Sequence, residues 1–159
     1  FLGRRNFALR DSRGGTLVQA DSLWLYYNAE RSRPERPPQE MLEAYQLDEP
    51  LAMEYAGTRK IRLPELMEAL PPFPVRRTDL DTNRHVNNGQ YVRMAADLFS
   101  VEQVREFRME YRKAAHLGDT IFPRRGREGG WEVIALCDGS GKPYAVAAAQ
   151  GECEAQEGE

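Results

Sequence analysis

Apolar and charged residues alternate without a break over residues 106–112, where the sequence is Glu-Phe-Arg-Met-Glu-Tyr-Arg. A period of two is typical of a β-strand that buries one face. Three later segments, residues 120–125, 131–137 and 143–150, also predict strands, and short turns separate them. The second half of the chain therefore predicts four strands in succession.

A helical period precedes these strands. Four residues are spaced i, i+3, i+4 and i+7, namely Tyr91, Met94, Ala95 and Leu98. This spacing places them on one stripe of a helix that faces a core. A helix followed by such strands is most simply an α+β domain, in which one long helix packs on a face of an antiparallel sheet. Wrapped around the helix, this sheet would form a hot-dog fold.

The N-terminal residues predict a separate β-hairpin. Residues 7–9 and 17–27 would be its strands, joined by a turn that contains Gly14 and Gly15. Apolar residues occupy both faces of the second strand, so we expect both faces to be covered over the second half of this strand. A lone hairpin is only marginally stable in water, so these strands are expected to join a larger sheet.

A linker is predicted over residues 28–72. Three prolines, at 34, 37 and 38, exclude a helix or a central strand at that point and indicate a rim loop. A short helix is predicted over residues 39–46, and a turn or short helix over residues 65–70.

Composition narrows the class of function. The net charge is −3 and the pI is about 5.6, so nucleic acid is not an expected partner. The two cysteines, Cys137 and Cys153, form no disulfide framework and no CxxC pair, which favours free thiols in a reducing compartment. No apolar run approaches the roughly 20 residues of a membrane helix, and no signal peptide is evident. We therefore expect a cytoplasmic protein without a membrane partner. Two histidines with no supporting cysteine or acid arrangement predict neither a metal site nor a cofactor.

The candidate chemistry lies in residues 78–91, a polar segment at the start of the helical pattern. It contains Asp79, Asp81 and His85 together with several asparagines. A loop that leads into a helix N-terminus also gathers unpaired backbone N–H groups and the positive end of the helix dipole. Acyl transfer needs a base or nucleophile, a group that handles a proton, and donors for a developing oxyanion. The segment therefore predicts an acyl-transfer site.

The run from Asp79 to Asn88, followed by Tyr91, resembles the signature of acyl-acyl carrier protein thioesterases. The hairpin that ends at Trp24, the Arg- and Pro-rich rim at 33–37 and the segment 109–119 resemble the same family and follow in the same order. The resemblance implies two tandem hot-dog domains, with the signature at the start of the second. It divides the chain into residues 1–27 as the end of an incomplete first hot-dog domain, 28–72 as the linker, 73–151 as the second hot-dog domain and 152–159 as an acidic tail.

The resemblance places catalytic roles on Asp81, Asn83 and His85. Asp81 would act as the general base for water or attack the thioester directly. His85 would hold or donate a proton near neutral pH, and Asn83 would position the water or the thioester carbonyl.

The predicted substrate-binding residues are Asn88, Gly89 and Tyr91. Backbone amides around Asn88 and Gly89 would bind the oxyanion, a contribution of roughly 3–4 kcal/mol when they are well aimed. Helix caps and Asx turns are the more common use of aspartate and asparagine before a helix, and we expect that structural use for Asp79, Asn87 and Asn88.

One position departs from the family pattern. The family has a further acidic residue on the next strand, whereas this chain has Ala114 and Ala115 at the matching place. Three outcomes stay open: the other residues suffice, another acid substitutes, or activity is reduced or lost. His116 is expected to be an ordinary histidine at the rim. Most of the family's first hot-dog domain has no counterpart in this sequence, so the chain is expected to be a fragment or a trimmed form. In the family this domain supplies much of the acyl pocket, so the preferred length of the acyl chain is not predicted.

Six arginines would form either a basic rim for an acidic carrier protein or a solvated sheet face balanced by Glu106 and Glu110. They are Arg105, Arg108, Arg112, Arg124, Arg125 and Arg127.

The sequence thus predicts hydrolysis of fatty acyl thioesters on acyl carrier protein, with release of free fatty acid in fatty acid biosynthesis. The alternatives are a hot-dog acyl-CoA thioesterase and a catalytically impaired hot-dog protein that binds acyl thioesters. The expected partner is an acyl carrier protein or a CoA thioester. If the chain is complete, the half-sheet at residues 7–27 is also expected to pair, most simply with a second copy in a homodimer.

Overall fold

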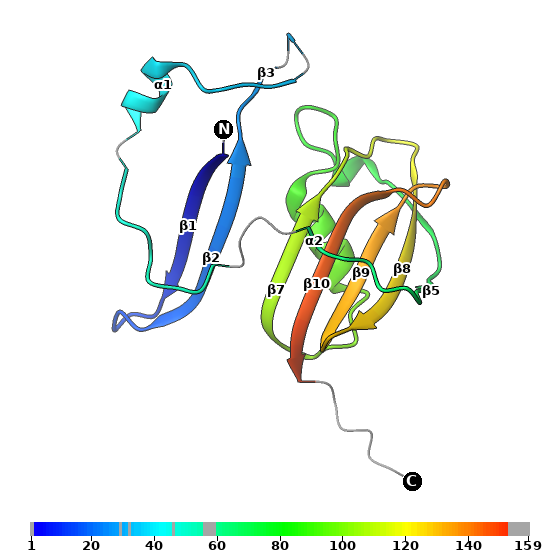
Figure 1. Cartoon of the computed structure of the whole chain (residues 1–159). Helices are drawn as coiled ribbons and strands as arrows, with labels where there is room; N and C mark the ends of the chain where they lie inside the picture. Colours follow the sequence, from blue (N-terminus) through cyan, green and yellow to red (C-terminus); the bar gives the residue numbers. More distant parts are fainter. Residues whose placement is uncertain (1, 29, 32, 46, 56–59, 153–159) are drawn as a thin grey trace. The chain divides into compact units, whose positions relative to one another are not determined.

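The structure, a computed structural model, describes residues 2–28, 30–31, 33–45, 47–55 and 60–152 (Figure 1). The chain forms two compact units, residues 1–59 and 60–159. Most of the predicted acidic tail, with Cys153, lies outside the described residues. No helix in the described part of the chain is long and apolar enough to span a membrane.

The first unit contains the predicted hairpin. Strand β1 (Leu2–Arg10) pairs antiparallel with β2 (Thr16–Leu25), so the first strand begins at residue 2 rather than 7. In the turn, the Asp11 carboxylate accepts the N–H of Gly15 at 2.7 Å. Gly14 has a φ of 85°, a conformation that side chains other than glycine rarely adopt. The predicted Gly-Gly turn is therefore confirmed.

Apolar side chains on this hairpin stay exposed. Phe7 is 51% exposed, Trp24 48% and Leu25 52%. Within the unit, Tyr55 crosses the hairpin, and its hydroxyl lies 3.0 Å from Oδ1 of Asn6. The expectation that the second strand is covered on both faces is wrong for the described structure, because this single crossing segment leaves most of the apolar surface open.

The remainder of the first unit is short and polar. Strand β3 (Tyr27–Asn28) pairs with β4 (Arg33–Pro34), so the predicted rim loop contains a two-residue strand. A proline fits there because the strand is short and lies at an edge. Helix α1 (Gln39–Ala44) starts directly after Pro38 and confirms the predicted helix, although none of its residues is buried.

The second unit is built on one antiparallel sheet, and its four long strands confirm the four predicted ones. They are β7 (Gln103–Tyr111), β8 (Thr120–Glu128), β9 (Trp131–Cys137) and β10 (Pro143–Glu152). Two short strands pair with β8, namely β5 (Glu68–Ala69) and β6 (Phe73–Pro74). The strand order is β5-β8-β9-β10-β7, with β6 also beside β8.

The segment 65–70 agrees with its prediction only in part. The chain bends at residues 65 and 66, in line with the predicted turn, and then forms β5 instead of the alternative helix. The reason is a ladder contact, because Glu68 and Ala69 lie opposite Arg125 and Arg124 of β8. Such pairing depends on residues far away in the sequence and overrides a weak local preference.

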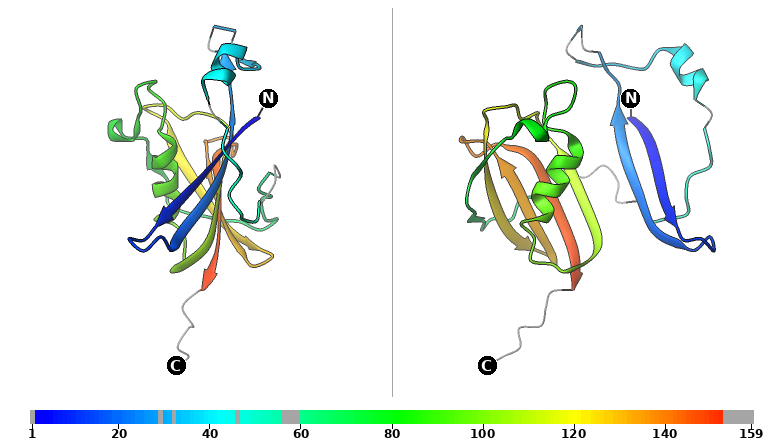
Figure 2. Two further views of the ribbon diagram at one scale, coloured as in Figure 1. Left: turned by 90° about the vertical axis from the view of Figure 1, so that its left-hand side faces the viewer. Right: turned by 180° about the vertical axis from the view of Figure 1, so that it is seen from behind.

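Helix α2 (Asn88–Ala96) packs on one face of this sheet (Figure 2). Three residues of the predicted stripe, Tyr91, Met94 and Ala95, are buried in the core, whereas the fourth, Leu98, lies beyond the end of the helix and is only partly buried against the same core. The same core cluster holds Ala145 and Ala147 of β10, whose small side chains allow the helix to approach the sheet. An antiparallel sheet with one main helix, here nine residues long, is the predicted α+β arrangement.

The opposite face of the sheet is also covered. Ile61 packs there with Val133 and Val146 in a second cluster of buried residues. At Gly126 the chain crosses so closely that an added Cβ would lie 2.7 Å from the carbonyl oxygen of Leu66. The core strands are therefore buried on both faces, and the edge strand β7 is more exposed.

Candidate active site

A buried aspartate anchors the candidate segment. Asp79 is 2% exposed and ends a short 3₁₀ turn, Arg77–Asp79. Its Oδ2 accepts the backbone N–H of Arg76 at 2.7 Å, and its Oδ1 accepts from the guanidinium of Arg93 on α2 at 3.1 Å. Its backbone carbonyl accepts the N–H of Asn87 at 2.9 Å. Both carboxylate oxygens are thus used within the fold, and the structural role expected for Asp79 is confirmed.

The three predicted catalytic residues lie on one tight turn. Oδ1 of Asp81 accepts the backbone N–H groups of Asn83 (2.8 Å) and His85 (3.2 Å). The Asp81 N–H in turn donates to the carbonyl of His85 at 2.8 Å. Arg84, next to His85, has a φ of 61°, an uncommon conformation for a residue with a side chain. One oxygen of Asp81 therefore holds the backbone of the other two residues.

The turn presents its side chains outward. Asn83 and His85 are exposed, and Asp81 is half-buried beneath them. Within the described residues, Oδ2 of Asp81 has no hydrogen-bond partner and remains open to a water molecule. The arrangement can thus supply a carboxylate oxygen, an amide and an imidazole from within five consecutive residues.

The structure places the second histidine of the chain against the first. The ring centroids of His85 and His116 are 4.8 Å apart, and the rings meet edge to face at 89°. The two residues also face each other in an isolated antiparallel bridge. A helix and a strand separate them in the sequence, so no local pattern could join them. His116 is exposed and precedes a turn, as expected of a rim histidine, and the structure adds that it is a neighbour of the predicted site.

The position that lacks an acid lies beside this pair. Ala115 is fully buried, and its carbonyl accepts the N–H of Val86 at 2.9 Å. Its N–H donates to the hydroxyl of Tyr91 at 2.8 Å. Ala114 is exposed. The backbone of this segment therefore docks against the turn and the helix, although no carboxylate comes from residue 114 or 115.

The start of α2 is only partly available for an oxyanion. Asn87 caps the helix, and its side-chain oxygen accepts the N–H of Gly89 at 2.8 Å. The Gly89 amide is therefore already bonded, contrary to its predicted use. The N–H of Asn88 has no acceptor within the described residues and remains the candidate donor. Tyr91 is 2% exposed, and burial raises its pKa, so its neutral hydroxyl serves the core in this structure.

A chain of polar contacts supports the segment that carries His116. Oδ2 of Asp119 accepts the backbone N–H of His116 (2.9 Å) and the hydroxyl of Tyr144 (3.0 Å). Burial, followed by the hydrogen bond to Asp119, raises the pKa of Tyr144 to about 12. The Lys113 ammonium lies 4.3 Å from the centre of the Tyr144 ring and pairs with Asp138. Lys113 holds the pKa of the Asp138 carboxyl well below its usual range.

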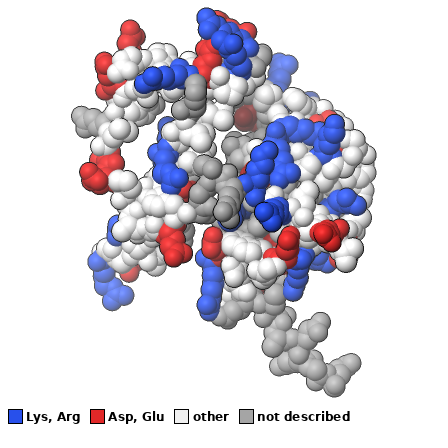
Figure 3. Space-filling model, in the orientation of Figure 1, with Lys and Arg blue, Asp and Glu red and all other residues white. Residues whose placement is uncertain are grey.

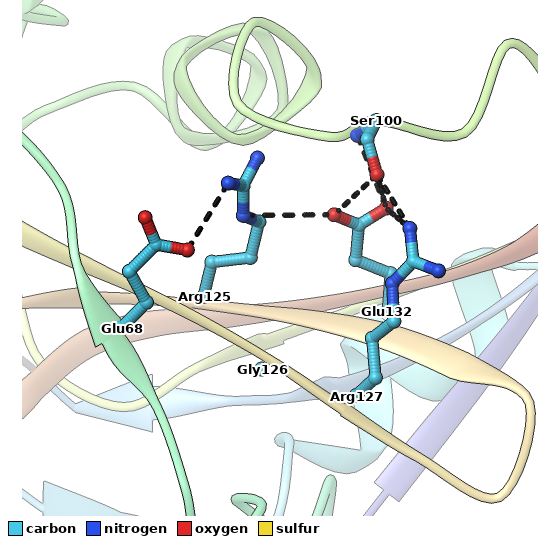
Figure 4. A pocket seen from close by; sticks show the side chains of 6 residues that line it. All are labelled: Glu68, Ser100, Arg125, Gly126, Arg127 and Glu132. Carbon is cyan, nitrogen blue, oxygen red and sulfur yellow. Dashed lines mark hydrogen bonds and ion pairs between the residues drawn. The ribbon is translucent and has the colours of Figure 1, made fainter. Parts of the chain in front are cut away.

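A surface pocket of about 280 Å³ lies away from these residues (Figure 4). It contains the buried carboxylate of Glu132, which accepts the N–H of Ser100 at 3.0 Å. Arg125 and Arg127 each lie 3.9 Å from this carboxylate, and Arg125 also pairs with Glu68 at 3.2 Å. Two positive and two negative groups balance each other in this pocket. It fastens the chain after α2 to the sheet and adds no residue to the candidate site.

Part of the predicted basic rim is neutralised. Arg112, Arg125 and Arg127 all form ion pairs with glutamates. On the face that Figure 3 displays, Lys and Arg side chains gather over the middle of the second unit, and acidic side chains lie mostly below them. The ion pairs fit a balanced sheet face and the gathered cations fit a basic rim, so both alternatives stay open.

Comparison with known proteins supports the relationship inferred from the sequence. Residues 67–132 match the family described as the acyl-ACP thioesterase C-terminal domain. This segment includes Asp81, Asn83, His85 and His116. No curated protein sequence matches the chain.

Two solved structures are similar over nearly the whole chain. An acyl-ACP thioesterase from Bacteroides thetaiotaomicron has a TM-score of 0.78 and 21% identity, and the match covers 94% of this chain and 62% of that protein. The 12:0-ACP thioesterase from Umbellularia californica has a TM-score of 0.76 and 24% identity, with 96% and 63% covered. The chain thus spans less than two thirds of the length of either protein, and at these identities the likeness establishes the fold. Residues 67–132 therefore match the acyl-ACP thioesterase family, and the chain has the hot-dog fold of these two thioesterases.

Proposed function

We propose that this chain hydrolyses fatty acyl thioesters carried by acyl carrier protein and releases free fatty acid, as a step of fatty acid biosynthesis. The observation that carries the proposal is the turn at residues 81–85. Its Asp81 carboxylate binds the backbone of Asn83 and His85 with one oxygen and leaves the other oxygen open. The family of residues 67–132 and the fold of the two relatives support the same chemistry.

The proposed reaction starts at the open oxygen of Asp81. This oxygen takes a proton from water while the water oxygen bonds to the thioester carbonyl carbon. Asn83 orients the water or the carbonyl, and the N–H of Asn88 donates to the oxyanion that forms. When the intermediate collapses, the C–S bond breaks and His85 donates a proton to the leaving thiolate. The proton that Asp81 took from water then passes to His85, which restores both residues. In total one water is consumed, and one carboxylic acid and one thiol are formed.

Two substitutions test this proposal. Asp81→Asn keeps the shape of the side chain but removes the base, and His85→Ala removes the proton donor. Each should lower kcat/KM by about 100-fold or more, the usual scale for a lost general acid or base. Asp97→Asn, an exposed carboxylate at the other end of α2, is the matched control and should leave the rate unchanged. Full activity in both site variants would contradict the proposal.

The same assay separates the carriers. Thioesters of a single acyl chain on acyl carrier protein and on CoA are compared at equal concentration. Preference for the carrier protein supports the proposal, and equal or better hydrolysis of the CoA thioester favours an acyl-CoA thioesterase.

A second candidate function rests on two specific observations. Ala114 provides no acid beside His85, and the Gly89 amide is already bonded to Asn87. Both would suit a protein that binds acyl thioesters without turning them over. Tight binding of the acyl carrier protein thioester without release of fatty acid, measured by calorimetry and product analysis on one sample, would favour this candidate.

A further inference from the structure

The contact between the two histidines is the least expected feature of the candidate site. Both rings are exposed, and the edge of one meets the face of the other at a centroid distance of 4.8 Å. Edge-to-face packing is a favoured geometry for aromatic rings. An exposed side chain without such a neighbour samples several rotamers. The contact therefore restricts the orientations open to His85.

The segment that carries His116 is itself held in place on both sides of this residue. The backbone of Ala115 bonds to Val86 and to the buried hydroxyl of Tyr91. On the other side, the carboxylate of Asp119 accepts the N–H of His116. These hydrogen bonds fix the backbone of the segment, so the His116 side chain can in turn position the His85 ring.

Position 116 also relates to the missing acid. Ala114 and His116 stand on either side of Ala115, which is buried in the core, and both are exposed. Position 114 offers no carboxylate, whereas position 116, two residues further on, offers an aromatic ring against His85.

We infer that His116 is the positioning residue for His85 and replaces, by ring packing, the support that an acidic residue at 114 would give. This inference rests on the proposed thioester hydrolysis. The His116 ring fixes the orientation in which His85 donates its proton to the leaving thiolate.

Four variants of the full chain test the inference, with octanoyl and hexadecanoyl thioesters of acyl carrier protein as probes. His116→Ala removes the ring, His116→Phe restores a ring without nitrogen, and Ala114→Glu is combined with His116→Ala. Leu117→Ala, an exposed residue in the same turn, is the control. We expect His116→Ala to lower kcat by about tenfold to a hundredfold at nearly constant KM, the scale of a misplaced catalytic group. His116→Phe and the double variant should recover most of this loss, and Leu117→Ala should behave as the wild type.

A second readout does not depend on activity. The chain contains two histidines, so the imidazole C–H signals in an NMR spectrum belong to only two rings. Loss of the His116 ring current should shift the His85 signals, and Leu117→Ala should leave them in place. Unshifted His85 signals in His116→Ala would overturn the inference whether or not the protein is active.

The outcomes also separate this inference from the proposed function. Wild-type kcat in His116→Ala, or a His116→Phe variant as slow as His116→Ala, contradicts the positioning role and leaves thioester hydrolysis intact. An inactive wild type that becomes active on Ala114→Glu alone also contradicts the role, because His116 would then fail to replace the acid. Inactivity of both the wild type and Ala114→Glu contradicts the proposed function itself and, with it, any role of His116 in that reaction.

Discussion

The hydroxyl of Tyr91 offers a sharp test of how the site is built. It accepts the N–H of Ala115 at 2.8 Å in a region where both residues are buried. Tyr91→Phe keeps the ring and its packing but leaves the Ala115 N–H without a partner. An unsatisfied buried donor costs about 1–3 kcal/mol, so the variant should lose this much free energy of unfolding. For a unit of this size the loss corresponds to a fall in Tm of at least about 4 °C.

Tyr111→Phe is the matched control for that measurement. The Tyr111 hydroxyl donates to the carbonyl of Asn88 at 3.2 Å, but this side chain is 43% exposed. Water can replace the lost bond, so we expect a change of less than about 0.5 kcal/mol. Urea unfolding followed by tryptophan fluorescence and circular dichroism measures both variants. Equal losses in the two variants, or a loss below about 0.5 kcal/mol for Tyr91→Phe, would refute the reasoning.

Three further predictions concern single positions. Gly126→Ala should destabilise the second unit by about 1–3 kcal/mol, because the added Cβ would lie 2.7 Å from the Leu66 carbonyl oxygen. A Tm equal to that of the wild type would show that the segment around Leu66 moves away at little cost. Arg84→Gly should raise stability by up to about 1 kcal/mol, since it removes the strain of a φ of 61°, and a clear loss in urea unfolding would mean that the arginine side chain stabilises the turn. Because the pKa of Tyr144 is raised from 10.0 to about 12, its neutral hydroxyl contributes a stability to the fold that is fully present below pH 10 and is lost as the pH rises to 12. Ultraviolet titration should show this late ionisation, and Asp119→Asn should lower the pKa of Tyr144.

Much of the fold follows from local sequence patterns. The alternation over residues 106–112 predicts a strand, which β7 confirms, although burial does not alternate along it, since Phe107 is 37% and Tyr111 43% exposed. The stripe from Tyr91 to Ala95 reports which side of the helix faces the core, and this side is confirmed. The Gly14 turn is equally local, since a positive φ favours glycine. Such features depend only on neighbours within a few residues, which is why the sequence is sufficient to predict them.

Other features depend on partners that lie far away along the chain. β5 exists because Glu68 and Ala69 meet β8, and its own sequence does not favour a strand. The prediction that the N-terminal hairpin is covered was wrong for a related reason, since apolar residues such as Trp24 and Leu25 indicate only that a surface could be buried. In both segments the outcome depends on which distant residues pack against them.

The candidate site shows the same division. The resemblance of residues 79–88 to the family signature singles out Asp81, Asn83 and His85, which lie within five residues. It does not predict that His116 meets His85, because a helix and a strand intervene. Nor does it show that the cap at Asn87 uses the Gly89 amide, because several first-turn amides compete for one side-chain oxygen.

The rate of fatty acid release from an acyl carrier protein thioester, compared between the wild type and Asp81→Asn, tests the central claim most directly. A single-turnover experiment with protein in excess makes the comparison independent of product release. We predict that the wild type forms free fatty acid and that Asp81→Asn forms it at least about 100-fold more slowly. The Tm of the variant should lie within a few degrees of that of the wild type. Release at the wild-type rate by Asp81→Asn would contradict the claim that the turn at residues 81–85 is the catalytic site.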